Sequence, residues 1–210
     1  LTHDMTLWNP PHKINPGWSV LADHLKTNGY RTFCIMTRNH FGGGKTFGFD
    51  RGYDEHDESA DYNRQMEQTE QFVIERFRRH HTEGPVFVYA QINATHEPFD
   101  PPEPFYSMYG PDYRDLYRGQ IAYVDHHLGR IFAALAEIGI LDDTLIVCFA
   151  DHGTEFWEHE FIEKKCNMYR ELLDVPLIFR FPRRLTRGRV VDGLVETVMV
   201  APTLVDIAGL

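Results

Sequence analysis

The sequence is poor in the features that mark several large classes of protein. It has three cysteines, Cys34, Cys148 and Cys166, which provide neither a disulfide framework nor a paired Cys-x-x-Cys metal site. No apolar run is long enough to cross a bilayer, and no basic segment followed by an apolar one opens the chain. With 21 basic against 31 acidic residues, the net charge is −10. Because no Lys/Arg-rich stripe offsets this charge, we expect no nucleic-acid partner. Because no apolar run is long enough, we expect no membrane span in this chain.

What is present is typical of a globular α/β protein. Hydrophobic residues make up 42% and charged residues 25% of the 210 positions, which is ordinary for a soluble domain with a sizeable core. There is no internal repeat, low-complexity tract or linker. We therefore expect one domain over residues 1–210, and the sequence leaves its compartment and oligomeric state open.

Hydrophobic periodicity predicts an alternation of helices and strands. The expected helices cover 17–28, 64–80, 112–139 and a stretch from 201, and the expected strands cover 32–36, 86–92, 144–150 and 175–181. A Gly-rich, acidic loop is expected at 41–61 and a Pro-rich loop at 98–111. This alternation indicates an α/β layer fold with a mostly parallel central sheet flanked by helices. Ligands of such sheets bind beyond the carboxyl ends of the strands, after 36, 92 and 150.

The run 144–150 leads directly into Asp151, His152 and Gly153. A carboxylate and an imidazole side by side at a strand end can both bind one cation, with the glycine allowing a sharp turn. The structural alternative is that Asp151 caps the next helix and His152 is incidental. From these residues alone the two interpretations are about equally good.

His96 follows the run 86–92, at a loop tip where a proton donor or positive charge could meet an anionic substrate. A loop histidine bonded to the backbone is the commoner outcome.

Arg38 and His40 follow the strand at 32–36. Cys34 imitates the first residue of a Cys-x-Pro-x-Arg motif, but Met36 replaces the proline, so we interpret Cys34 as a core residue.

Six segments, spread over nearly the whole chain, follow patterns known from one family. The segment 144–153 resembles a strand that ends in Asp-His-Gly, and 155–178 resembles the pattern "gEH…K…LYEE…VPLI". Upstream, 21–32 resembles "LaeyLkeaGYrT" and 48–54 resembles "GFDrGFDe". Tyr123, Asp125 and Gly129 fall in a long helix of the same pattern, and 201–209 resembles "aPTlldlaGl". Together and in this order, these segments resemble the sulfatase family of the alkaline phosphatase superfamily.

The resemblance implies an alkaline-phosphatase-like sandwich and assigns a role to six residues. Asp151 and His152 correspond to metal ligands, with Ca²⁺ as the first expectation and Mn²⁺ or Zn²⁺ as alternatives. His96 corresponds to the histidine near the leaving oxygen. Lys165, with Lys164 beside it as an alternative, corresponds to the lysine that neutralises the transferring anion, and Arg38 and His40 correspond to the Lys-x-His that follows "GYrT".

The function implied is metal-dependent hydrolysis of a small-molecule or saccharide sulfate ester. The family's nucleophile, a formylglycine made from cysteine, is expected upstream of Leu1, so we expect a catalytic domain that is incomplete at both ends. A phosphonate monoester or phosphodiester hydrolase, or a phosphoglycerol transferase of the same superfamily, is an alternative. A non-catalytic relative of the fold is another, although keeping Asp151, His152, His96 and Lys165 together argues against it.

Overall fold

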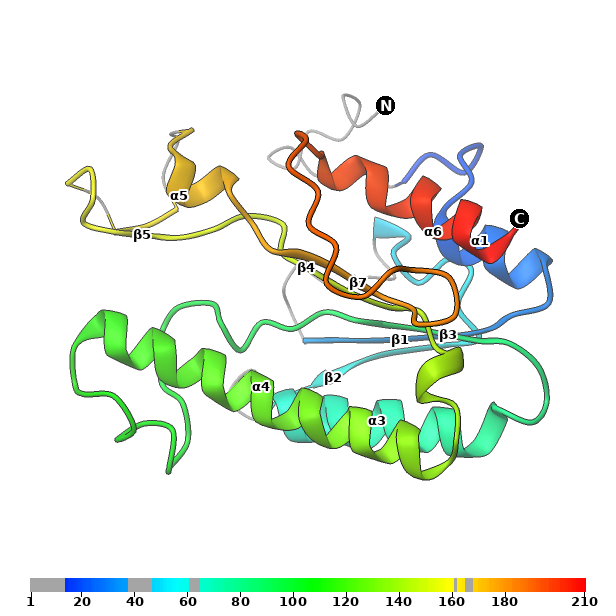
Figure 1. The fold of residues 1–210 in the computed structure, drawn as a ribbon, viewed down its shortest axis with the longest axis horizontal. Helices are drawn as coiled ribbons and strands as arrows, with labels where there is room; N and C mark the ends of the chain where they lie inside the picture. The colour runs from blue at the N-terminus through cyan, green and yellow to red at the C-terminus, as the bar shows by residue number, and fades with distance from the viewer. Residues whose placement is uncertain (1–13, 38–46, 61–64, 161, 165–167) are drawn as a thin grey trace. The chain divides into compact units, whose positions relative to one another are not determined.

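The computed structural model describes residues 14–37, 47–60, 65–160, 162–164 and 168–210. The chain forms two compact units, Leu1–Ile131 with Gly209–Leu210, and Phe132–Ala208. Among the described residues no helix is both long enough and apolar enough to cross a membrane. Figure 1 labels the helices and strands along the chain.

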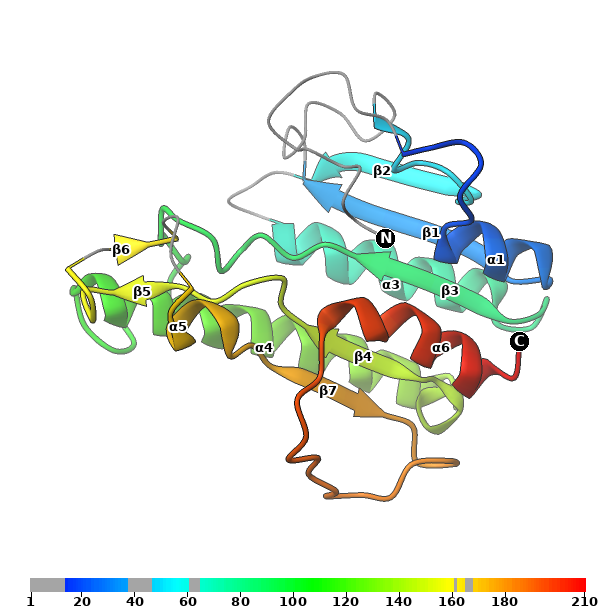
Figure 2. The same ribbon diagram turned by 90° about the horizontal axis from the view of Figure 1, so that it is seen from above.

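The first unit is built on a parallel three-stranded sheet with the order β2-β1-β3. Its strands are β1 (Arg31–Thr37), β2 (Glu55–Ala60) and β3 (Val86–Ala90), and they are visible side by side in Figure 2. The register pairs Cys34 with His56 on one side and with Tyr89 on the other. The carboxyl ends of β1 and β3 therefore meet at one edge of the sheet, where an α/β fold holds its ligands.

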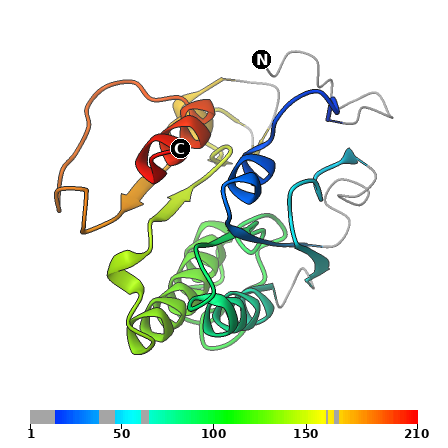
Figure 3. The same ribbon diagram turned by 90° about the vertical axis from the view of Figure 1, so that its right-hand side faces the viewer.

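Alternation along β1 separates two faces of this sheet. Phe33 and Ile35 are buried with Phe72 of α3 (Gln65–His80), and partly buried residues of β3 pack against this cluster. Helix α3 and the long helix α4 (Tyr113–Glu137) lie on this side, and α1 (Leu21–Thr27) lies on the other (Figure 3). Cys34 and Met36 point to the side of α1, because neighbouring residues of a strand face opposite ways.

The loop before β2 is held against α1 by a glycine and an ion pair. Gly52 has a φ of 80°, and a Cβ there would lie 2.3 Å from the backbone nitrogen of Asp23. Only glycine permits both this left-handed conformation and this close approach. The Arg51 guanidinium lies 2.6 Å from the Asp23 carboxylate, so the segment that resembles "GFDrGFDe" is a docking loop for α1.

A half-buried network of polar groups joins α3 to α4. The Glu70 carboxylate lies 2.6 Å from His127 Nδ1 and accepts a hydrogen bond of 2.8 Å from Arg130 Nε. One turn away, the Tyr123 hydroxyl donates to Glu67. Burial raises the pKa of the Glu70 carboxyl, but the hydrogen bonds from Arg130 and His127 outweigh it, so the pKa lies below its ordinary 4.5.

This network predicts a component of acid stability that depends on Glu70. Because the folded-state pKa is lowered, its stabilisation is complete above about pH 4.5 and is lost as the pH falls through that lowered pKa. We expect Glu70→Gln to reduce the free energy of unfolding at pH 7 by about 1–3 kcal/mol, and by clearly less at pH 3. Urea unfolding at both pH values measures this. Glu75→Gln on the same helix, at an exposed carboxylate beside Arg76, is the control, and an equal loss in both variants would contradict the role of Glu70.

The second unit holds two antiparallel strand pairs and short helices. Strand β4 (Ile146–Phe149) pairs with β7 (Leu177–Arg180), and β5 (Glu155–Phe156) pairs with β6 (Ile162–Glu163). The helices are α5 (Arg170–Leu173) and α6 (Val200–Ala208), with the 3₁₀ turns η2 (Leu141–Asp143) and η3 (Thr197–Met199). Within this unit, β4 leads to Asp151 and β7 follows α5.

The expected α/β class is confirmed, and the long helices match closely: 64–80 was expected where α3 covers Gln65–His80, and 112–139 where α4 covers Tyr113–Glu137. The prediction of a loop over 41–61 was wrong for its last residues, because Glu55–Ala60 form strand β2. Three of the six residues of β2 are acidic and its sole apolar residue is Ala60, so it shows no hydrophobic run. It pairs along β1 at the edge of the three-stranded sheet, where polar side chains are tolerated.

Candidate active site

The loop after β3 is fixed by buried amide groups. The backbone nitrogen of Asn93 donates a hydrogen bond of 2.5 Å to Gln65 Oε1, and Gln65 Nε2 donates to the carbonyl of Gln91. Asn93 Nδ2 in turn donates a hydrogen bond of 2.5 Å to the hydroxyl of Thr37, the last residue of β1. Gln65 and Asn93 are both buried. These bonds hold the carboxyl ends of β1 and β3 together and give the loop that carries His96 a firm base.

His96 lies at the turn of this loop, and its side chain is 24% exposed. Its Nδ1 lies 2.8 Å from the carbonyl oxygen of Glu97 and 3.2 Å from the Glu97 carboxylate. Because both of these oxygens are acceptors, Nδ1 is the ring nitrogen that donates its proton to them. The ring is therefore oriented by Glu97, and Nε2 is the nitrogen suited to exchange a proton with a substrate.

Three of the six candidate residues, Arg38, His40 and Lys165, lie outside the described residues. Thr37, the last described residue before Arg38, ends β1 and is hydrogen-bonded to Asn93 of the loop that carries His96. His96 belongs to the first unit, and Asp151 and His152 belong to the second.

Asp151 and His152 are brought together in the second unit, directly after β4. Asp151 Oδ1 lies 3.8 Å from His152 Nε2 and accepts a hydrogen bond of 3.0 Å from the His152 backbone nitrogen. His152 Nδ1 lies 2.8 Å from the carbonyl oxygen of Gly153. Since Nδ1 donates its proton to this carbonyl, the ring is held in the tautomer whose Nε2 carries the lone pair.

This donor pair fits one divalent cation. Two ligands about 2.1 Å from a tetrahedral ion lie roughly 3.4 Å apart, close to the separation of Asp151 Oδ1 and His152 Nε2. The Asp151 side chain is 84% exposed, so its carboxylate is accessible. The oxygen and nitrogen donors suit Ca²⁺, Mn²⁺ or Zn²⁺ and do not choose among them.

Gly153 holds the neighbouring Asp151 and His152 against helix α5. Its backbone nitrogen donates a hydrogen bond of 2.9 Å to the carbonyl of Leu172 in α5. A Cβ at position 153 would lie 1.9 Å from the carbonyl oxygen of Glu171 and 3.0 Å from its carbonyl carbon. The Asp-His-Gly segment thus lies against the backbone of α5, at a distance that a larger residue does not permit.

Lys164 also reaches His152. It follows β6, and its Nζ lies 3.0 Å from His152 Nε2. Because β5 and β6 form a hairpin, residues before β5 and after β6 lie side by side, which explains how positions 152 and 164 meet. The sequence named Lys165 first and Lys164 as its alternative. The described structure places Lys164, and Lys165 lies outside the described residues.

A second group of possible metal ligands was missed by sequence reasoning. Glu155, His159 and Glu171 offer one ligand atom each within 4.8 Å of one another, with His159 Nε2 3.2 Å from the Glu171 carboxylate. Glu155 is fully buried, and the His159 ring stacks on Tyr169 with 3.6 Å between the ring centres. Glu171 lies 12 residues beyond His159, so no local spacing signals the group.

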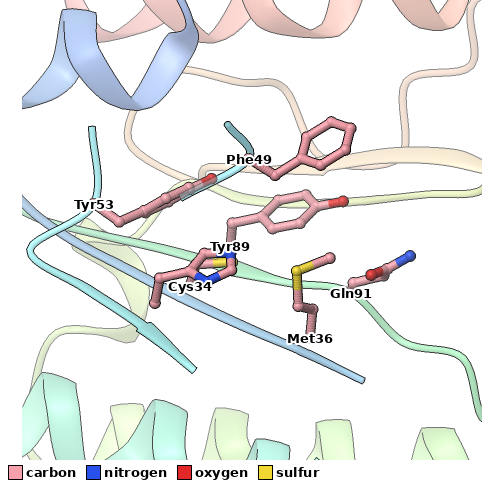
Figure 4. A pocket seen from close by; sticks show the side chains of 7 residues that line it. Cys34, Met36, Phe49, Tyr53, Tyr89 and Gln91 are labelled. Carbon is pink, nitrogen blue, oxygen red and sulfur yellow. The ribbon is translucent and has the colours of Figure 1, made fainter. Parts of the chain in front are cut away.

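A small pocket of about 190 Å³ opens on the face of the first unit's sheet that carries Cys34 and Met36. Its lining includes Tyr53, Tyr89 and Gln91, which Figure 4 shows around the two sulfur-containing side chains. Cys34 is buried, and burial, together with the nearby carboxylates of β2, raises the pKa of its thiol to about 12. The interpretation of Cys34 as a core residue is confirmed, since a thiol with so high a pKa is not an active nucleophile.

Comparisons with known proteins agree with this fold. A sequence model of the family described as Sulfatase matches residues 2–210. The N-acetylglucosamine-6-O-sulfatase of Bacteroides thetaiotaomicron is 37% identical over 93 residues, which are 44% of this chain and 16% of that protein. Because the Sulfatase model matches nearly the whole chain, the chain belongs to the sulfatase family.

Solved structures extend the likeness in fold to nearly the whole chain. Ps i-CgsB matches with a TM-score of 0.78 and 16% identity, covering 98% of this chain and 56% of that one. It has also been solved in complex with k-i-k-neocarrahexaose. BT4656, in complex with its substrate D-glucosamine-2-N,6-O-disulfate, matches with a TM-score of 0.73 and 17% identity, covering 95% of this chain and 62% of that one. The chain therefore spans little more than half the length of these relatives.

Proposed function

We propose that this chain is part of an enzyme that hydrolyses sulfate esters, with Asp151 and His152 contributing to a site for one divalent metal ion. The observation that carries the proposal is the Asp-His-Gly segment of a sulfatase-family chain, with His152 Nε2 oriented as a ligand beside the Asp151 carboxylate. The metal, when bound, supplies a positive charge that polarises the sulfate group. Ca²⁺ is our first expectation, and Mn²⁺ and Zn²⁺ are the alternatives.

The other candidate residues receive roles that follow from their chemistry. His96, whose Nδ1 is held by Glu97, donates a proton from Nε2 to the departing alcohol oxygen as the S–O bond to the ester breaks. Arg38 and His40 stabilise negative charge on the sulfate oxygens. The nucleophile, a formylglycine made from cysteine, is expected from residues upstream of Leu1. The complete reaction consumes one water and releases the alcohol and hydrogen sulfate.

A sulfated saccharide is the substrate class we propose. BT4656 was solved with a sulfated glucosamine and Ps i-CgsB with a carrageenan hexaose, and the Bacteroides relative is a sulfatase of N-acetylglucosamine. Saccharide hydroxyl and sulfate groups would be recognised by the polar side chains at the carboxyl ends of the strands.

The experiment compares matched esters. The full-length polypeptide that contains these residues is assayed on 4-nitrophenyl sulfate, 4-nitrophenyl phosphate and a phenylphosphonate monoester. We expect kcat/KM for the sulfate to exceed that for the other two by 100-fold or more, a difference of about 2.7 kcal/mol in transition-state binding. Mass spectrometry of the peptide upstream of Leu1 should find an aldehyde in place of a cysteine. Preference for a phosphorus ester, with an unmodified serine or threonine in that peptide, would contradict the proposal.

The lysine that neutralises the sulfate can be assigned by paired substitutions. The 3.0 Å contact between Lys164 Nζ and His152 Nε2 supports Lys164, whereas Lys165 remains a prediction from the resemblance. We expect Lys164→Ala to lower kcat by about 100-fold, because it removes a charge that stabilises the transition state. Lys165→Ala is the matched control and should change kcat by less than about threefold. The reverse order would assign the role to Lys165.

A further inference from the structure

The hairpin that carries Lys164 has an unusual residue at its turn. Trp157, directly after β5, is 64% exposed. A buried tryptophan side chain makes one of the largest apolar contributions to stability that a single residue can make. Because most of the Trp157 side chain is exposed, its indole makes little of this contribution. Packing within the described part of the second unit therefore does not explain why position 157 is a tryptophan.

The backbone gives no reason for a tryptophan either. Trp157 has a φ of 69°, and among the described residues it and Glu160, with a φ of 66°, are the two non-glycine residues in the left-handed region. This conformation costs an L-residue about 1–2 kcal/mol and costs glycine nothing. The pattern "gEH", which 157–159 resembles, has glycine at this position. A bulky aromatic residue held exposed in a strained conformation points to a functional contact.

The position of Trp157 relative to His152 defines what it can contact. His152 and Lys164 flank the open end of the β5–β6 hairpin, and Trp157 lies at its closed end. Positions 152 and 157 are five apart in sequence, which corresponds to at most about 17 Å along an extended chain. Both residues belong to the second unit. A ligand that reaches both the metal site proposed at Asp151 and His152 and the Trp157 ring would therefore run along the length of the hairpin.

The charge of the hairpin restricts this ligand further. Trp157 is followed by Glu158 and then, after His159, by Glu160, so the turn that carries the indole also carries two carboxylates, of which that of Glu158 accepts a hydrogen bond from the backbone nitrogen of Phe156. A sulfated sugar ring would be repelled there, whereas a neutral ring places its apolar C–H face on the indole and its hydroxyls near carboxylate oxygens. This arrangement fits an oligosaccharide that carries a neutral ring at some distance from its reacting sulfate.

We propose that Trp157 is a substrate-binding residue that stacks against a neutral sugar ring of a sulfated oligosaccharide, beyond the sugar whose ester is hydrolysed. This proposal rests on the proposed function, and it makes substrate length a determinant of affinity. A small aryl sulfate fills the ester site alone and does not reach Trp157. Removing the indole should therefore weaken binding of long substrates and leave short ones unaffected.

The test uses the full-length polypeptide and two probes, the short 4-nitrophenyl sulfate and the long k-i-k-neocarrahexaose. We expect Trp157→Gly to raise KM about 10-fold for a long probe that the wild type hydrolyses, and to change kcat/KM for the aryl sulfate by less than twofold. Trp157→Phe keeps a flat ring and should recover most of the affinity. Thermal unfolding is the structural control, because glycine relieves the backbone strain and should keep or raise Tm.

The outcomes separate this proposal from the one it rests on. A wild-type enzyme that hydrolyses none of the sulfate probes would overturn the proposed function and the stacking role with it. If the wild type hydrolyses both short and long probes and Trp157→Gly leaves both KM values unchanged, the stacking role alone is overturned. Equal losses on the short and the long probe, or hydrolysis of the aryl sulfate without binding of k-i-k-neocarrahexaose, would also overturn it.

Discussion

Replacing His152 with alanine should lower the rate of sulfate ester hydrolysis by about 10³-fold or more and weaken metal binding. The substitution removes the Nε2 donor that Gly153 orients, and leaves Asp151 as the one ligand of the pair. A single lost electrostatic contact to a developing charge costs 10²–10³ in kcat, and a lost metal ligand also affects the ion that makes other such contacts. Activity and bound metal, measured together on the full-length polypeptide, check this result.

A control separates this effect from general damage. His81 lies at the end of α3 in the first unit, where its ring bonds to the carbonyl of Phe77 within the same helix. We expect His81→Ala to keep the wild-type metal content and to change kcat by less than twofold. If His152→Ala retained both its metal and its activity, Asp151 and His152 would not form the metal site.

Replacing Gly153 with alanine should strongly destabilise the second unit. The new methyl group would lie 1.9 Å from the carbonyl oxygen of Glu171, and both groups belong to backbone that hydrogen bonds hold in place. We expect the free energy of unfolding to fall by about 3 kcal/mol, because overpacking against backbone is not relieved by a change of rotamer. Urea unfolding measures the loss.

Gly129→Ala is the matched control for this substitution. Gly129 lies within α4, and a Cβ there would meet nothing within 4 Å. Alanine is favoured over glycine inside a helix by about 1 kcal/mol, so this variant should be as stable as the wild type or more so. Equal losses in the two variants would show that the close approach of Gly153 to α5 does not hold the Asp-His-Gly segment.

The sequence predicted the elements whose signals are local. The apolar face of 112–139 predicted α4 because burial of one face every 3.6 residues is a property of the helix itself. It did not predict β2, whose residues Glu55–Ala60 are polar and become a strand by pairing with β1. The antiparallel pairing of β4 with β7 was likewise unforeseen, since a pattern of buried strands carries no information about direction.

The same distinction applies to the site. The sequence singled out Asp151 and His152 because they adjoin a strand end, and the structure places Asp151 Oδ1 3.8 Å from His152 Nε2. Their role as metal ligands stays a prediction. The contact of Lys164 with His152 depends on the β5–β6 hairpin. Each of its strands has only two residues, which is too short to give a periodic signal in the sequence. The group of Glu155, His159 and Glu171 depends on the packing of this hairpin on α5, which sequence spacing does not encode.

The most direct test of the account is the position of the bound metal. Crystals of the full-length polypeptide grown with Mn²⁺ would give an anomalous scattering peak at the ion. The account predicts one strong peak in contact with the Asp151 carboxylate and His152 Nε2, and its loss in His152→Ala. A peak at Glu155, His159 and Glu171, with none at Asp151, would contradict the assignment and move the metal site to the hairpin.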